Sequence, residues 1–298
     1  MSATLHELSS NIAELVAAAD KHIVRVEGRR RLSATGVIYR ADGLIVTANH
    51  VVERDEDLNI GLSDGTTHRA TLVGRDPRSD IALLLIEANS LPAATWSDPS
   101  SLRVGHIVLA LGRPGRTVQA TLGVISALGG GWRTAAGADI EHYLQTDVAM
   151  YPGFSGGPLL TADGSFAGLN SSSLVHGISV ALPAPTINRV VETLLQHGRV
   201  PRGYLGIGIQ PVRLSGTLQE RAGQETALMV MSVESGSPAE QAGLIQGDIL
   251  VTLAGQPLRQ VDDLQSLLGS TPAGKAVPAR VARGGDIQEL TVTIGQSK

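Results

Sequence analysis

Cysteine is absent from this chain of 298 residues. Disulfide bridges, thiolate metal sites and a cysteine nucleophile are therefore excluded together. Aromatic residues make up only 3% of the sequence, and the formal net charge at pH 7 is −4. Because nucleic acid is bound by basic faces with stacking rings, this composition argues against a nucleic-acid partner. We interpret the one basic run, Arg29-Arg30-Arg31, as a solvated turn between strands rather than a phosphate site.

Long apolar runs are also missing. No window reaches the roughly 18 apolar residues that a membrane-spanning helix needs, so we expect no membrane span. Residues 1–21 have apolar side chains at helical spacing, but neither a basic start nor a continuous apolar stretch. They predict an amphipathic helical segment without an export signal. A cytoplasmic location is expected for the chain as written, and a periplasmic or other extracytoplasmic one if a signal has been removed.

What the chain does have is a regular series of short apolar strands. Hydrophobic residues make up 42% and charged residues 17%, which is typical of a globular protein, and the length allows two domains with separate cores. Predicted strands recur about every eight to twelve residues, with turn signals such as Asp42-Gly43 between them. Helical crossovers do not intervene, so the pattern predicts a mainly β fold, either a sandwich or a pair of barrels. The segment 129–139 lacks an apolar period and is expected to be a surface loop.

A helix is predicted at the end of this first region. Residues 184–197 carry apolar side chains at helical spacing, and Gly198 follows as the residue that ends the helix. We therefore expect a first domain over 22–197 and a linker over 198–203. A second β-rich domain is expected over 204–298, with about five or six short strands and two short helices.

The stretch YPGFSGGPL, residues 151–159, contains a serine in a glycine-rich setting. Glycines around Ser155 allow a tight turn that exposes both its hydroxyl and the neighbouring amides. The N–H groups of Gly153 and Ser155 could then stabilise an oxyanion formed by attack of the Ser155 hydroxyl. Taken alone, the stretch is equally consistent with a hairpin turn.

An acyl-transfer serine needs a base, and a carboxylate that orients the base. His50 follows the apolar strand 44–48, and Asp80 precedes the most apolar strand, 81–86. Taken singly, each is better interpreted as structural. His50 would then be a histidine whose hydrogen bonds are satisfied within the fold, and Asp80 a turn or cap residue. Together with Ser155 they give the order histidine, aspartate, serine, which is known for serine-protease triads. The histidines show no metal-ligand spacing, so we expect no metal and no cofactor.

Several segments resemble one protease family. TANHVV, DPRSDIALLLI and QTDVAMYPGFSGGPLL are similar to the three signature blocks of the HtrA/Deg family of trypsin-like serine proteases. LGRPG and TLGVISALG resemble further blocks, and the tail, with RGYLGIGIQ and SGSPAEQAGLIQGDIL, resembles the family's PDZ domain. The resemblance implies a chymotrypsin-like double β-barrel followed by a PDZ domain. It also implies an ATP-independent endopeptidase that cleaves unfolded or misfolded polypeptides.

The resemblance assigns roles to the candidate catalytic residues. It makes His50 the general base, Asp80 the orienting carboxylate and Ser155 the nucleophile. The oxyanion hole is assigned to Gly153 and Ser155.

The resemblance also places a specificity pocket and a peptide groove. Met150 is assigned to the primary specificity pocket, with Ser173 and Leu174 on the opposite wall. A methionine there is apolar and adaptable, so we expect cleavage after small or medium aliphatic residues such as Val, Ala or Leu. The alternative interpretation of Met150 is core packing.

In the second domain, successive main-chain amides are expected to bind the C-terminal carboxylate of a peptide. These amides belong to Tyr204, Leu205, Gly206 and Ile207. The peptide would add as a strand beside residues 207–210. Leu264 and Leu268, on a predicted helix, are interpreted either as pocket residues or, somewhat better, as core.

The sequence departs from the family pattern at several points. Phe154 stands where the family usually has asparagine, and Gly130 stands where it commonly has arginine. The resemblance implies a homotrimer, but the aromatic residues that often make that contact are missing near residues 1–25. Two alternatives stay open beside the protease: a catalytically silent scaffold that binds C-terminal peptides, and a holdase-type chaperone. The presence of all the triad residues favours the protease.

Overall fold

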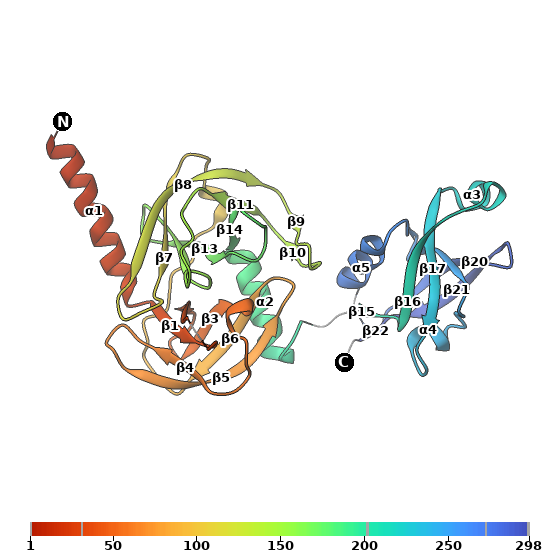
Figure 1. Cartoon of the computed structure of the whole chain (residues 1–298), viewed down its shortest axis with the longest axis horizontal. Coiled ribbons are helices and arrows are strands. Elements are labelled where there is room, and N and C mark those ends of the chain that lie inside the picture. Colours follow the sequence, from red (N-terminus) through yellow and green to blue (C-terminus); the bar gives the residue numbers. More distant parts are fainter. Residues whose placement is uncertain (1, 31, 201–202, 272, 297–298) are drawn as a thin grey trace. The chain divides into compact units, whose positions relative to one another are not determined.

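The chain folds into two compact units, Met1–Val200 and Pro201–Lys298 (Figure 1). The computed structural model describes residues 2–30, 32–200, 203–271 and 273–296. The first unit contains two closed six-stranded barrels, and the second is built on one antiparallel sheet. The expected pair of β-barrels is thus confirmed, and the sandwich alternative is wrong.

The first barrel has the strand order β1-β2-β3-β6-β5-β4. Its strands are β1 Ile23–Glu27, β2 Ala34–Ile38, β3 Leu44–Ala48, β4 Leu58–Gly61, β5 Thr67–Asp76 and β6 Ile81–Ile86. Every residue of β2 and β3 is buried, and for β3 this explains its continuous apolar run. In the β3–β6 ladder Ala48 pairs with Ile81. The chain that leaves β3 therefore lies beside the chain that enters β6.

The second barrel has the order β11-β14-β13-β12-β7-β8. Its strands are β7 Ile107–Gly112, β8 Gln119–Gly129, β11 Tyr143–Thr146, β12 Pro158–Thr161, β13 Phe166–Ser171 and β14 Ser179–Pro183. The short 3-10 helix η2 Pro99–Ser101 precedes it. Helix α2 Ala184–His197 packs on strands of both barrels and ends at Gly198, which has a φ of 68°. Figure 1 shows α2 running along the two barrels.

Helix α1 Ser2–Asp20 precedes the first barrel and extends away from it (Figure 1). Its C-terminal half packs on the core through Ile12, Leu15, Val16 and Ala19. Its N-terminal half leaves Leu5 and Leu8 exposed. Within the parts of the chain that the structure describes, no helix has both the length and the apolar character needed to cross a membrane.

The segment 129–139 is not wholly a loop, so the prediction made for it is wrong. Strand β9 Trp132–Arg133 pairs with β10 Asp139–Ile140. Arg133 forms an ion pair with Asp139, and the Trp132 ring meets the Tyr143 ring edge-on with centroids 5.5 Å apart. Strands of two residues are too short to show an apolar period.

The second unit has a sheet of order β16-β17-β18-β20-β21, in which β16 is an edge strand. Its strands are β15 Gly203–Tyr204, β16 Ile207–Arg213, β17 Thr226–Val233, β18 Ile249–Leu253, β19 Gln256–Pro257, β20 Ala276–Arg283, β21 Asp286–Thr293 and β22 Gly295–Gln296. Its helices are α3 Gly216–Ala222, α4 Pro238–Gln241 and α5 Val261–Ser270. The predicted count of five or six strands and two helices is too low, because the two-residue strands and one short helix have no periodic signal.

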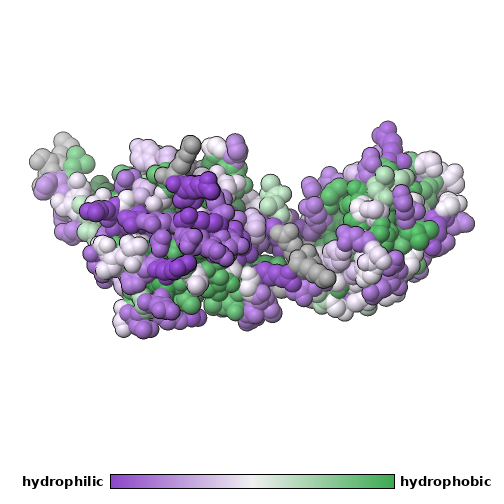
Figure 2. Space-filling view, turned by 60° about the horizontal axis from the view of Figure 1, so that its bottom comes forward, coloured by the Kyte–Doolittle hydropathy of each residue, from purple (hydrophilic) through white to green (hydrophobic). Residues whose placement is uncertain are grey.

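Figure 2 shows mainly hydrophilic residues over the first unit on the face drawn, and larger hydrophobic areas on the second. Exposed apolar side chains of the second unit include Met231 and Ile245.

Candidate active site

His50 and Asp80 are brought together by the strand register of the first barrel. His50 lies in the 3-10 turn η1 Asn49–Val51 directly after β3, and Asp80 directly precedes β6. The His50 ring nitrogen Nδ1 lies 2.8 Å from Asp80 Oδ2, and the His50 main-chain N–H donates to Asp80 Oδ1 at 2.8 Å. The Asp80 carbonyl also accepts from the N–H of Asn49. One aspartate therefore fixes both the turn and the ring orientation.

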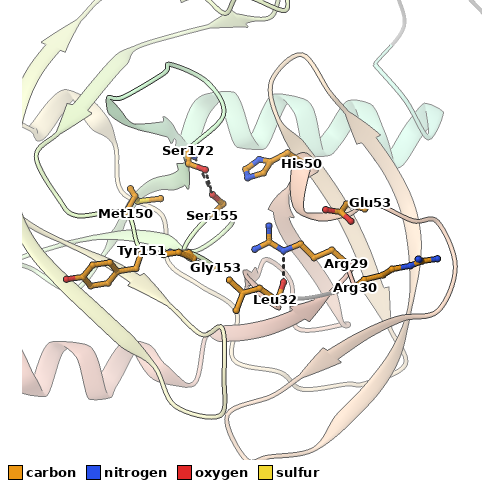
Figure 3. Close-up of a pocket in the computed structure, with 11 residues that line it drawn as sticks. Arg29, Arg30, Leu32, His50, Glu53, Met150, Tyr151, Gly153, Ser155 and Ser172 are labelled. Atoms are coloured by element: carbon orange, nitrogen blue, oxygen red, sulfur yellow. Dashed lines mark hydrogen bonds between the residues drawn. The ribbon is translucent and has the colours of Figure 1, made fainter.

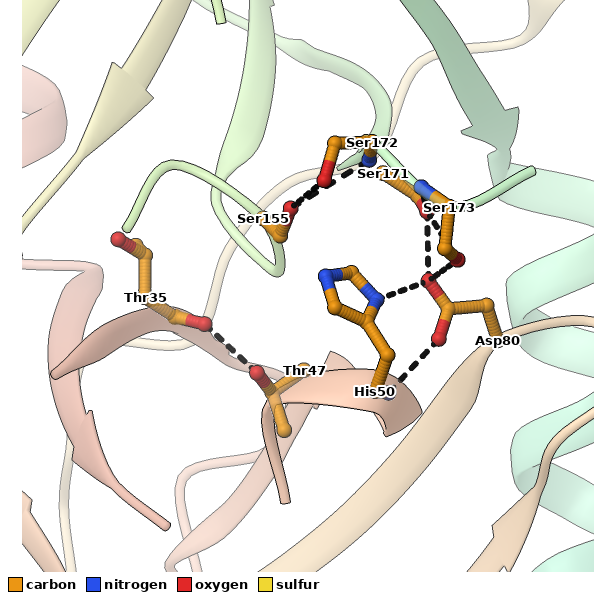
Figure 4. Close-up of polar contacts among 8 residues, drawn as sticks. All are labelled: Thr35, Thr47, His50, Asp80, Ser155, Ser171, Ser172 and Ser173. Carbon is orange, nitrogen blue, oxygen red and sulfur yellow. Dashed lines mark hydrogen bonds and ion pairs between the residues drawn. The ribbon is translucent and has the colours of Figure 1, made fainter. Parts of the chain in front are cut away.

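The Asp80 carboxylate is buried, with 3% of the residue exposed. Its Oδ2 atom accepts hydrogen bonds from the hydroxyls of Ser171 at 2.5 Å and Ser173 at 2.8 Å (Figure 4). Burial by itself raises the pKa of Asp80, but hydrogen bonds from His50 and Ser171 outweigh it, so the pKa lies below the ordinary value. The carboxylate is therefore ionised at neutral pH and keeps the proton of His50 on Nδ1.

Ser155 lies between β11 and β12 of the second barrel and faces the same site. Figure 4 shows the imidazole ring of His50 between Asp80 and Ser155. No hydrogen bond joins Ser155 to His50 among the described residues; the Ser155 hydroxyl instead lies 3.0 Å from the Ser172 hydroxyl. The Ser172 N–H also points to Ser155 Oγ at 3.4 Å. Because catalytic hydrogen bonds are often loose without substrate, the lack of this bond does not argue against a pairing of the two residues when substrate is bound.

His50 and Ser155 lie in a cleft of about 570 Å³. His50, Ser155 and Ser172 line its middle, and Met150 and Gly153 line one end (Figure 3). Arg29, Arg30 and Glu53 line the other end. The cleft is thus open to a chain that passes over Ser155. Among the described residues, no group of three or more His, Asp or Glu side chains could hold a metal ion.

The loop before Ser155 makes a tight turn that leaves two main-chain N–H groups without an acceptor in the described chain. The Phe154 N–H donates to the Tyr151 carbonyl at 3.0 Å, which closes a tight turn, and Gly153 has a φ of 93°. Only glycine adopts such a φ readily. The N–H groups of Gly153 and Ser155 have no acceptor within the described chain. They are therefore available to a bound oxyanion.

Thr35 of β2 holds this loop from the first barrel. Its hydroxyl donates to the Gly153 carbonyl at 2.6 Å, and its N–H donates to the Ser155 carbonyl at 3.3 Å. The same hydroxyl accepts from the N–H of Arg113 at 2.7 Å. Thr35 is fully buried. It thus bonds to the carbonyls on both sides of Phe154, and we call these contacts the Thr35 clamp.

Phe154, which departs from the family pattern, is fully buried in the second barrel. A side chain on Gly112 would meet its ring, because a Cβ atom there would lie 2.5 Å from Phe154 Cδ1. The ring also meets Tyr151 edge-on at 5.7 Å. The buried ring of Phe154 and the Thr35 clamp therefore hold this loop, although position 154 has no polar side chain.

Arg113 connects this loop with α1. Its side chain is almost fully buried, and its Nε donates to the Ile23 carbonyl at 2.9 Å. Its terminal nitrogens donate to the Arg116 carbonyl and to the carbonyl and carboxylate of Asp20, the last residue of α1. A signal for this residue is present in the sequence, since an arginine directly after the apolar run 107–112 must either be exposed or have several partners. Thr35, Ser171 and Ser172 gave no such signal.

Of the three residues predicted to form the specificity pocket, Met150 lines the cleft and the two on the opposite wall do not. Met150 lines the cleft and also packs against the Phe154 cluster, so both interpretations of it describe part of its surroundings. Ser173 bonds to Asp80, and Leu174 is buried in the core. Neither is among the residues that line the cleft. Their role in the pocket stays a prediction.

In the second unit, the predicted carboxylate-binding residues run from the end of β15 to the start of the edge strand β16. Gly206 has a φ of 76°, and a Cβ atom there would lie 2.3 Å from Ser237 Cβ. The carbonyls of Leu205 and Gly206 accept from Ala239 and Glu234, whereas the N–H groups of these two residues have no acceptor within the described chain. Tyr204 donates its hydroxyl to Glu234.

The two leucines of α5 that were singled out in the sequence, Leu264 and Leu268, differ in burial. Leu264 is buried in the core of the second unit, while Leu268 is half-buried. Helix α5 lies against β15 and β16. The core interpretation thus describes Leu264 better than Leu268.

Comparisons with known proteins match both units. The family of trypsin-like peptidase domains matches residues 34–169, and the PDZ domain family matches residues 203–294.

Curated relatives are DegP-like proteins. A probable periplasmic serine endoprotease DegP-like from Chlamydia pneumoniae is 33% identical over 277 residues, which cover 91% of this chain and 56% of that protein. A protein of the same name from Pseudomonas putida is 38% identical over 270 residues, covering 88% and 55%. The chain thus spans little more than half the length of these relatives.

Solved structures match nearly the whole chain. The serine endoprotease from Yersinia pestis has a TM-score of 0.73 and 30% identity, with 96% of this chain and 98% of that one covered. The HtrA-type protease AlgW with tripeptide has a TM-score of 0.69 and 32% identity, with 96% and 97% covered.

Proposed function

Because this chain belongs to the HtrA/Deg family of trypsin-like serine proteases with a C-terminal PDZ domain, we propose that it is an ATP-independent serine endopeptidase. Its substrates are unfolded or misfolded polypeptides. The observation that carries this proposal is the placement of His50, bonded to a buried Asp80, in one cleft with Ser155.

In the proposed mechanism Ser155 Oγ attacks the carbonyl carbon of the scissile peptide bond. His50 takes the hydroxyl proton on Nε2, and the Asp80 carboxylate stabilises the imidazolium that forms. The N–H groups of Gly153 and Ser155 bind the oxyanion; loss of one such donor costs about 10²–10³ in kcat in other serine proteases. His50 then gives the proton to the leaving amine, and water, activated by the same ring, releases the acyl group.

Substrate choice before the scissile bond is assigned to Met150. Its thioether side chain lines the cleft beside Gly153, and no carboxylate lies among the lining residues at that end. Small or medium aliphatic residues such as Val therefore fit better than Lys or Arg. Preferential cleavage after Lys or Arg would contradict this assignment.

The PDZ domain binds peptide C-termini for substrate capture or regulation. The free N–H groups of Leu205 and Gly206 would bind the carboxylate, and the open edge of β16 would accept the peptide as an added strand. A peptide with a free carboxylate should bind the full chain, whereas the same peptide with an amidated end should not. Equal binding of both would count against this assignment.

The location is proposed from the names of the relatives, and the assembly from the family resemblance of the sequence; neither rests on the geometry of the site. The curated relatives are named periplasmic, which favours an extracytoplasmic location and gives no support to a cytoplasmic one. We propose a homotrimer, to be tested by the molar mass in solution. A chaperone role is compatible with the protease.

The first test is covalent labelling by a fluorophosphonate probe, combined with degradation of unfolded casein. Wild type should label at Ser155 and degrade casein, and Ser155→Ala should do neither. Ser63→Ala, an exposed serine in the turn after β4, is the matched control and should behave as wild type. Absence of both activities in wild type, even with C-terminal peptides added, would favour the silent scaffold instead.

A further inference from the structure

The end of the cleft opposite Met150 is lined by cations that have no carboxylate partner. Arg29 and Arg30 lie in the bend between β1 and β2 and line the cleft (Figure 3). Neither forms an ion pair among the described residues, whereas ten arginines elsewhere in those residues do. The position of this pair agrees with the predicted turn between strands, with Arg29 half-buried and Arg30 exposed, while Arg31 lies outside the described residues.

Arg29 is the better placed of the two. Its Nε donates to the Leu32 carbonyl, which fixes the plane of the guanidinium group. Figure 3 shows this group pointing towards Ser155 and Gly153, whereas Arg30 points away from them. The terminal nitrogens of Arg29 have no partner in the described chain and are free to bind a carboxylate in a two-pronged geometry.

The direction of a bound substrate follows from the two ends of the cleft. With the residue before the scissile bond at Met150, the residues after that bond extend from Ser155 towards Arg29. His50 delivers a proton to the leaving amine on this side, so this end receives the leaving segment.

The charges at this end give a net positive field. Arg29 and Arg30 contribute two positive charges, and Glu53, which is exposed, contributes one negative charge. The whole chain has a net charge of −4, so the cleft differs in sign from the rest of the molecule. A local field of this kind attracts acidic segments and repels basic ones.

We propose that Arg29, with Arg30 at the outer edge, forms a subsite for acidic residues that follow the scissile bond. The preferred substrates are then unfolded chains with an aliphatic residue before that bond and Asp or Glu in the first positions after it. This inference rests on the proposed endopeptidase function. It adds a preference for the residues that follow the scissile bond to the preference proposed for the residue before it.

The test uses three internally quenched peptides that share the same segment up to a cleaved Val. After Val they continue with Ser-Asp-Glu, Ser-Asn-Gln or Ser-Lys-Lys. The measured quantity is the ratio of kcat/KM for the acidic peptide to that for the neutral peptide. For wild type this ratio should be about three to ten, since partly exposed charge pairs contribute modestly, and it should fall in high salt.

Single substitutions show which side chain causes the preference for the acidic peptide. Arg29→Gln should bring the ratio close to one, Arg30→Gln should lower it less, and Glu53→Gln should raise it. Arg29→Glu should reverse the preference in favour of the lysine peptide, a gain that misfolding cannot mimic. Arg54→Gln removes a neighbouring exposed arginine that does not line the cleft, and it should leave the ratio as in wild type.

The outcomes separate this inference from the function on which it rests. If wild type cleaves the neutral peptide but shows a ratio near one, the subsite is refuted and the endopeptidase stands. An equal loss of preference in Arg54→Gln would also refute it. If no peptide is cleaved and Ser155 is not labelled, both proposals fall.

Discussion

Replacing Thr35 by valine should slow catalysis while leaving the fold in place. Valine has nearly the same shape as threonine but lacks the hydroxyl that donates to the Gly153 carbonyl and accepts from the Arg113 N–H. Both of these main-chain groups lose their partner. Each buried group left unpaired costs about 1–3 kcal/mol.

The loop can relieve part of this cost by turning the peptide group after Gly153, because glycine tolerates many backbone angles. Such a turn disturbs the N–H groups of Gly153 and Ser155, which should face the oxyanion. If the aligned loop becomes less favourable by about 1.4–2.7 kcal/mol, kcat falls about 10- to 100-fold. KM should change little, since Met150 is untouched.

The assay is kcat and KM on a Val-containing peptide, together with the labelling rate of Ser155 and the thermal unfolding midpoint. Thr35→Ser keeps the hydroxyl and should recover most of the rate. Thr47→Val is the matched control, because its equally buried hydroxyl donates to the Thr35 carbonyl at 2.6 Å and touches no carbonyl of the loop. A folded Thr35→Val with kcat within twofold of wild type, or an equal loss in Thr47→Val, would refute the reasoning.

Further changes test other parts of the structure. Ser171→Ala removes a donor that lowers the pKa of Asp80, so the pKa of this carboxyl group, followed by its chemical shift in a pH titration, should rise; an unmoved pKa would contradict this. Asp248→Asn weakens a buried pair with an arginine and should destabilise the second unit by about 1–3 kcal/mol in urea unfolding at neutral pH. Because the folded pKa of Asp248 is lowered, its contribution is present above the unfolded pKa and is lost as pH falls through the folded value, so wild type and variant should converge in acid. Gly112→Ala should push on the Phe154 ring and lower the melting temperature, with overpacking costing about 1–3 kcal/mol; an unchanged melting temperature would show that the ring can move aside.

The sequence predicted best those elements whose burial is continuous. Strands β3 and β6 occur at the predicted residues, 44–48 and 81–86, because strands that are almost wholly buried appear as largely apolar runs; Leu85 of β6 is the exposed exception. Their register places the residue before β6 beside the turn after β3. A hydrogen bond between His50 and Asp80 is therefore a consequence of two strand positions that the sequence indicates.

Contacts between the barrels could not be predicted in the same way. Thr35 and Gly153 are separated by 118 positions, and the hydroxyl of Thr35 is ordinary in a strand. Which carbonyl it meets depends on how the two barrels pack. Phe154 posed the same difficulty, because the sequence shows that the family's asparagine is missing but not that Gly112 leaves room for a ring.

The hydrogen bonds of Arg113 link α1, the first barrel and the loop before Ser155, which bears on when a newly made chain can become active. Its guanidinium group bonds to the end of α1 and to β1, while its N–H leads through Thr35 to the loop before Ser155. A nascent chain with only the first barrel formed can pair His50 with Asp80, but it has no aligned oxyanion site. The proteolytic activity proposed for this chain therefore requires both barrels to be formed and packed together, and a half-folded molecule would lack it.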